Sequence, residues 1–181
     1  MGLPMIFPTM FLMIIALGPI IFIEAYMFRG LGLSLERTVL STAAANIVST
    51  AIGIPVTWGL LFGLQMATNW TGGLTQGGSF WDILLGLTLQ APWVHPRGPE
   101  YDWIVYGAGL VLLVPFFFVS WLVEYWVVRF MARNAMIASG AEPSETGGKI
   151  KRAVRNANLV TYALLAVFVL IVLAVKLSGS S

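Results

Sequence analysis

Two glutamates lie inside long apolar stretches of this sequence, where an ionisable side chain is unusual. Glu24 and Glu124 each precede an arginine, Arg29 and Arg129, with the same five-residue separation. A carboxylate in a membrane-embedded segment is costly unless it is paired, and such groups often handle protons or cations or contact a substrate. The type and position of these residues therefore point to proton or cation handling as one possible chemistry.

A structural role for the glutamates is the competing interpretation. At 1.5 Å per residue, each glutamate lies roughly 7 Å along a helix axis from its arginine, near enough to the membrane boundary for its side chain to reach the interface. There it can accept a hydrogen bond from the arginine or from an asparagine on the adjoining helix. Those asparagines are Asn46 for Glu24 and Asn158 for Glu124. In this interpretation, each pair holds two helices together.

Similar segments in the two halves of the chain indicate an internal repeat. The segment 23–29 resembles 123–129, and the Ala-Asn-aliphatic-Val-hydroxyl pattern of 45–49 returns at 157–161. The interval from glutamate to asparagine is longer in the second half, where the added residues fall in a loop that tolerates insertion. Duplication of a two-helix unit is the preferred explanation, and chance similarity between apolar helices is the alternative.

The composition is that of a membrane protein. Of the 181 residues, 58% are hydrophobic and 10% are charged, whereas soluble domains carry roughly 25% charged residues. The absence of cysteine and the single histidine exclude thiolate zinc sites, iron–sulfur clusters and a haem held by two histidines. We expect no metal site, and the cofactor remains unknown. The basic residues do not alternate with exposed aromatic residues, so no nucleic-acid partner is expected.

Four apolar runs are long enough to cross a hydrocarbon core of roughly 30 Å. The expected fold class is an all-α integral membrane protein, a single membrane domain over 1–181 built from two helical hairpins of parallel topology. The predicted spans are 3–28 and 38–66 in the first hairpin (1–66), and 103–130 and 157–177 in the second (103–181). The segment 67–102 is predicted to be an outward loop that contains a short interfacial helix.

Basic residues are concentrated in the loops 29–37 and 129–155. The positive-inside rule therefore predicts that these loops are cytoplasmic. Both termini then face outward, toward a periplasm, the exterior or a lumen. The basic cluster at 149–155 can also attract anionic lipid headgroups, at about 1 kcal/mol per residue, although a topology signal explains it more simply.

Aromatic residues of the third span and of the predicted interfacial helix suggest a surface for a protein partner. The candidate interface residues are Trp81, Phe117, Trp121, Tyr125 and Trp126. Aromatic side chains are enriched where protein surfaces meet. We therefore expect contacts with other membrane protein subunits and with membrane lipids, and a pigment, quinone or lipid is possible at the shared interface.

Two functions from different classes follow from these features. The preferred one is a non-catalytic accessory or scaffolding subunit that packs through its aromatic-rich helices in a larger membrane complex. The alternative is a small oligomeric transporter or channel that uses Glu24 and Glu124 for proton or cation handling, and four helices are few for a monomeric pore. An enzyme is not expected, because the sequence has no Asp/His/Ser or multi-histidine constellation.

Overall fold

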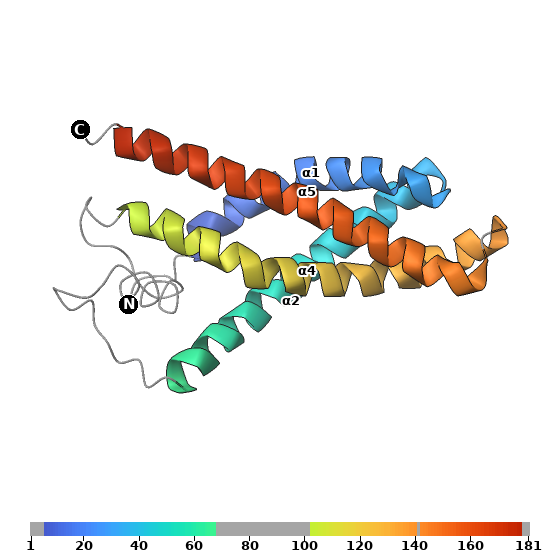
Figure 1. The fold of residues 1–181 in the computed structure, drawn as a ribbon, viewed down its shortest axis with the longest axis horizontal. Helices are drawn as coiled ribbons and strands as arrows, with labels where there is room; N and C mark the ends of the chain where they lie inside the picture. The colour runs from blue at the N-terminus through green and yellow to red at the C-terminus, as the bar shows by residue number, and fades with distance from the viewer. Residues whose placement is uncertain (1–5, 68–101, 141, 179–181) are drawn as a thin grey trace.

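Four long helices form the part of the chain that the computed structural model describes, residues 6–67, 102–140 and 142–178. They are α1 (Ile6–Phe28), α2 (Leu35–Ala67), α4 (Asp102–Ala138) and α5 (Pro143–Ser178), and the short 3-10 helix η1 (Arg29–Leu31) follows α1. Figure 1 shows that the connection between α1 and α2 and the turn between α4 and α5 lie at the same end of the molecule. Helix α4 packs against α5 and α2, and α1 packs against the same two helices.

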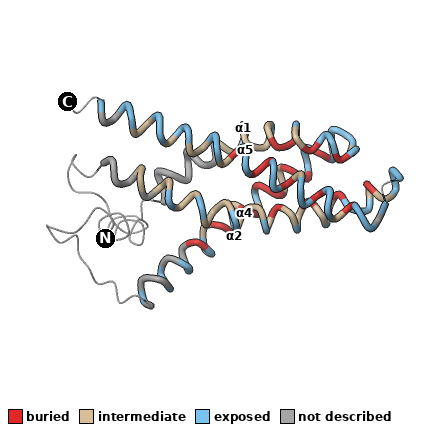
Figure 2. The backbone as a smooth tube through the Cα atoms, viewed as in Figure 1, coloured by how far each residue is buried: buried red, intermediate tan, exposed pale blue. Residues whose placement is uncertain are grey.

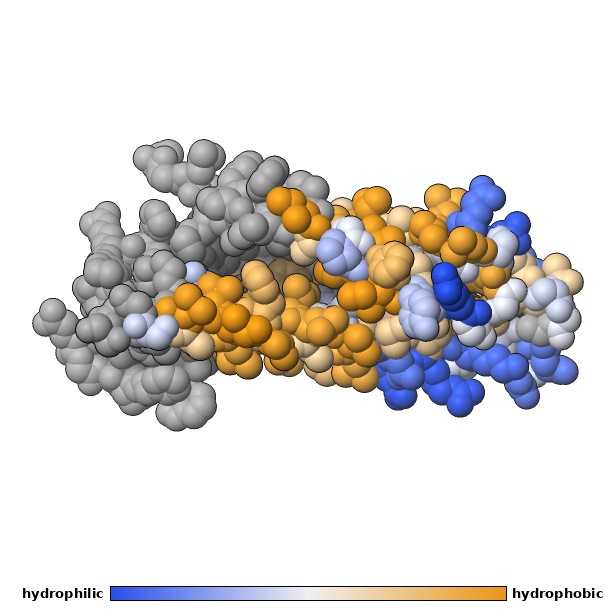
Figure 3. Space-filling view, turned by 90° about the horizontal axis from the view of Figure 1, so that it is seen from above, coloured by the Kyte–Doolittle hydropathy of each residue, from blue (hydrophilic) through white to orange (hydrophobic). Residues whose placement is uncertain are grey.

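Three of these helices contain stretches that are long and apolar enough to cross a membrane. The stretches are Leu35–Thr57, Gly109–Ala138 and Ser144–Val175. Even the shortest, at 23 residues, extends about 35 Å at 1.5 Å per residue, which exceeds the hydrocarbon core. Hydrophobic residues cover the middle of the face seen in Figure 3, and hydrophilic residues gather at one end. The protein is therefore a helical membrane protein, as its composition predicts.

The helices extend further on the basic side than the predicted spans. Helix α4 continues to Ala138, beyond the end of the predicted span at 130, and α5 begins at Pro143, ahead of the predicted span at 157–177. By composition, 139–148 is expected to be a solvated turn between a helical extension of the third span and a helical lead-in to the fourth, but the residues from Pro143 onward belong to α5. Proline is well suited to a first helical turn because its missing N–H would be unpaired there in any case. An ion pair of 2.9 Å between Lys149 and Glu145, one turn apart, adds local support.

A glycine in the left-handed conformation follows η1, and another follows the end of α4. Gly32 has a φ of 72° and Gly140 a φ of 95°, a conformation that side chains with a Cβ rarely adopt. Gly32 donates its N–H to the carbonyl of Arg29 at 3.2 Å. Ser34 then precedes α2, and its side-chain oxygen accepts from the N–H of Arg37 at 3.4 Å. These local signals let the chain reverse direction in few residues.

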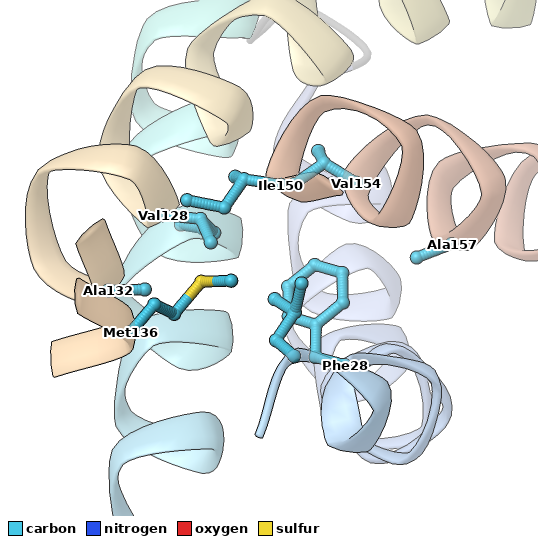
Figure 4. Packing of buried hydrophobic residues seen from close by; sticks show 9 residues of the cluster. Phe28, Val128, Ala132, Met136, Ile150, Val154 and Ala157 are labelled. Carbon is cyan, nitrogen blue, oxygen red and sulfur yellow. The ribbon is translucent and has the colours of Figure 1, made fainter. Parts of the chain in front are cut away.

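The buried residues lie mainly in the half of the molecule that contains these connections (Figure 2). The apolar core consists of Phe28, Leu31, Ala45, Val128, Ala132, Met136, Ile150, Val154 and Ala157, most of which Figure 4 shows in place. The alanines of this core, Ala45, Ala132 and Ala157, allow the helix backbones to approach closely. Close packing is important in lipid because the hydrophobic effect does not drive helices together there. This packing brings the polar residues of the neighbouring turns into the protein interior.

Some sequence-based predictions lie outside the described residues. These are residues 3–5 of the predicted first span and the segment 68–101, with its expected interfacial helix and Trp81.

Candidate functional site

The two glutamates are buried, and each is bonded to an asparagine. The Nδ2 of Asn46 on α2 donates to Oε2 of Glu24 on α1 at 2.6 Å. The Nδ2 of Asn158 on α5 donates to Oε2 of Glu124 on α4, also at 2.6 Å. All four side chains belong to the buried set. The structure thus brings together the two pairs that the sequence suggested.

The second oxygen of each glutamate is bonded across the two halves of the chain. Thr161 on α5 donates its hydroxyl to Oε1 of Glu24 at 3.0 Å, and Ser49 on α2 donates to Oε1 of Glu124 at 3.1 Å. Each of these hydroxyl residues lies three positions after an asparagine of its helix, almost one turn further on. Each of α2 and α5 therefore gives an amide to one glutamate and a hydroxyl to the other.

Ser120 is a site residue that the sequence analysis missed. Its Oγ lies 2.8 Å from Oε1 of Glu124 and 3.2 Å from Oγ of Ser49. The only available signal was its position four residues before Glu124, which places both side chains on one face of α4. The matching position in the first half is Ile20, so the two carboxylates do not have identical surroundings.

One small cavity is shared by the two glutamates. Its volume is about 110 Å³, and it lies between all four helices. The residues that line it are Ala16, Leu17, Ile20, Glu24, Asn46, Ser49, Thr50, Ser120, Glu124, Thr161, Tyr162 and Leu165. A water molecule needs a space of only about 10–15 Å³, so the cavity can hold water or a small ion beside the carboxylates.

The two arginines contact aromatic rings and not the glutamates. The guanidinium carbon of Arg29 lies 5.1 Å from the ring centre of Tyr26. Arg129 lies 5.4 Å from the ring centre of Trp126 and donates to the hydroxyl of Tyr125 at 2.9 Å. Such cation–π contacts contribute about 0.5–1 kcal/mol at exposed sites. Within the described ranges, the ion pair that the structure contains joins Lys149 and Glu145 instead.

Three of the predicted interface aromatics are half-buried against their own chain. Phe117 stacks on Trp121 with ring centres 6.4 Å apart and meets Tyr162 of α5 edge-on at 5.5 Å. Trp121 and Tyr125 also pack against the apolar core. By contrast, Trp126 is 58% exposed. Of these four residues, Trp126 therefore presents the most surface to lipid or to a partner.

Comparison of the chain with protein-family models, with curated proteins and with solved structures finds no match in any of the three.

Proposed function

We propose that this protein is a small oligomeric membrane transporter or channel in which Glu24 and Glu124 take up a proton or a cation. The observation that carries the proposal is the shared cavity, which both carboxyl groups line without an ion pair to any basic side chain of the described segments. Two uncompensated carboxylates in a poorly solvated site are strongly unfavourable. A proton or a cation must therefore balance their charge.

The partners of the carboxyl groups suit a site that gains and loses a proton. Amide and hydroxyl groups can donate to a carboxylate, and they can also accept from a carboxylic acid. The Oδ1 of Asn158 is buried without a hydrogen-bond partner, so the amide beside Glu124 retains accepting capacity. The carboxylate oxygens already accept hydrogen bonds. A metal cation would need several further oxygen ligands, whereas a proton needs none. The site therefore favours a proton over a metal cation.

The proposal includes the finer membrane arrangement. In it α1 is a fourth span, because its 23 residues match the length required. The two halves form duplicated hairpins of parallel topology, and the exchange of hydroxyl bonds between them supports this duplication. The loops 29–37 and 129–155 are cytoplasmic and the termini face outward, since the basic residues gather in those loops.

Proton flux into liposomes tests the function directly. The purified protein is reconstituted with a pH-sensitive dye inside the vesicles, and a potassium diffusion potential drives entry. We expect Glu24→Gln and Glu124→Gln each to lower the flux at least tenfold with unchanged helicity and elution volume. Glu36→Gln, which changes an exposed carboxyl at the start of α2, is the control and keeps flux within about twofold.

The same vesicles distinguish a proton from a metal cation. At constant pH, a sodium or potassium gradient replaces the proton gradient, and uptake of the cation is measured. Flux of one cation that both glutamine variants abolish assigns the site to that cation. Wild-type flux in both variants contradicts the proposal, and so does loss of folding in both, because that result assigns the glutamates a purely structural role.

An accessory subunit in a larger membrane complex is the second candidate. The exposed aromatic side chains favour it, among them Phe22 at 76%, Trp126 at 58% and Phe130 at 88% exposure. These side chains could pack against another subunit, with a pigment, quinone or lipid at the contact. Purification from native membranes in mild detergent separates the candidates. A stoichiometric complex with other subunits supports this role, and a homo-oligomer that conducts ions supports transport.

A further inference from the structure

A groove of about 500 Å³ lies where α4 meets the first turns of α5. Trp121 contributes one wall from α4, and α5 contributes Gly148, Lys151, Arg152 and Arg155. The α5 positions follow the spacing of a single helical face, since residues three, four and seven apart lie on the same side of a helix. The groove is therefore a product of two helices that are packed together and is separate from the glutamate cavity.

Three of the groove residues are cationic, and none is acidic. The Nζ of Lys151 lies 5.7 Å from the ring centre of Trp121, which places a positive charge directly over an apolar wall. The acidic residue in the first turn of α5, Glu145, pairs with Lys149, and neither of them lines the groove. No carboxylate lines the groove, and Glu145 lies near enough to Arg152 for their charges to interact.

We propose that this groove binds the phosphate of an anionic phospholipid headgroup, with the start of an acyl chain against Trp121. Arginine matches phosphate oxygens through two parallel N–H donors. Trp121 belongs to the apolar stretch Gly109–Ala138, so the groove combines an apolar wall with three cationic residues. A phospholipid satisfies both sides, whereas free phosphate offers nothing to the apolar wall. This inference does not depend on the transport function.

Lipid binding to the purified protein tests the proposal. The protein is titrated in detergent micelles with phosphatidylglycerol, and bound lipid is counted by native mass spectrometry, with phosphatidylcholine as the neutral probe. The groove variant carries Lys151→Gln, Arg152→Gln and Arg155→Gln. The control variant carries Arg29→Gln, Arg37→Gln and Arg133→Gln, which removes the same charge from exposed positions outside the groove.

We expect the groove variant to bind phosphatidylglycerol at least about tenfold more weakly, because it loses charge-assisted hydrogen bonds to the phosphate that the control variant keeps. The control variant should stay within about threefold of wild type, and phosphatidylcholine binding should not change. Should the groove variant lose its fold, the single Arg152→Gln variant replaces it, with an expected loss of about fivefold.

Three results would overturn the proposal. One is unchanged phosphatidylglycerol binding in a folded groove variant. Another is an equal loss in the control variant, because it would mean that diffuse surface charge holds the lipid. The third is displacement of the lipid by millimolar inorganic phosphate, because the groove would then bind the free anion and not a headgroup.

Discussion

Thr161 donates a hydrogen bond to Glu24 at 3.0 Å, although 137 positions separate them in the chain. Asn158, one turn earlier on the same helix, is bonded to Glu124 instead. Helix α5 therefore contacts both carboxyl groups, and α2 does so in the same way through Asn46 and Ser49. As a result, neither glutamate has its full set of partners within its own half of the chain.

Thr161→Val should destabilise the protein through its bond to Glu24. The change keeps the shape of the side chain and removes the donor, so a loss of about 0.6–1.7 kcal/mol is expected from measured membrane hydrogen bonds. Unfolding in mixed micelles with increasing SDS measures this change in the free energy of unfolding. In double-mutant cycles, Thr161→Val should couple with Glu24→Gln by at least about 0.5 kcal/mol and only weakly with Glu124→Gln. Equal coupling of Thr161→Val to Glu24→Gln and to Glu124→Gln would show that the hydroxyl of Thr161 does not discriminate between the two glutamates.

Phe28→Ala should be among the most damaging single changes. Phe28 is fully buried in the core, and truncation of a buried phenylalanine typically costs about 3–5 kcal/mol in water-soluble proteins. Phe130, which is 88% exposed, is the matched control, and its replacement by alanine should cost less than about 1 kcal/mol. The thermal midpoints of the two variants in detergent measure the difference. A comparable shift in both midpoints would mean that Phe28 does not anchor the core.

Gly32→Ala and Gly140→Ala should each destabilise by about 1–2 kcal/mol. No atom lies within 4 Å of a Cβ built at either position, so the cost comes from the left-handed backbone alone. Gly59, which lies in α2 and also has open space around it, is the control. There alanine should be neutral or should stabilise by up to about 1 kcal/mol, because it favours a helix. Chemical denaturation gives the free energy of unfolding of the three variants and therefore their order of stability. An increase in stability on Gly140→Ala would contradict the prediction.

Arg129→Gln should leave proton flux within about twofold of wild type. The guanidinium is bonded to Tyr125 and lies over Trp126, so its loss removes no partner from Glu124. We expect a small loss of stability, about 0.5–1 kcal/mol. The liposome assay compares this variant with Glu124→Gln. A tenfold decrease in flux with Arg129→Gln would show that the arginine acts on the carboxylate after all.

The sequence predicted the helical membrane class because apolar composition and run length depend only on local residues. It also named Asn46 and Asn158 as partners of the glutamates, since each pair could be placed near one end of two adjoining helices. It did not anticipate the full length of α5. Residues 143–148 look like part of a solvated turn by composition, and their helical state depends on the capping turn and on packing against α4.

Sequence by itself determined that carboxyl groups lie inside apolar helices and that amides and hydroxyls recur at matched positions, because helical periodicity fixes which residues share a face. Only the tertiary structure decided that Thr161 reaches Glu24 and Ser49 reaches Glu124, that one cavity joins the two acids, and that Trp121 lines one groove with three cations of α5. These relationships depend on how helices distant in sequence pack together. That packing results from the combined fit of many small contacts and is not encoded in any single segment.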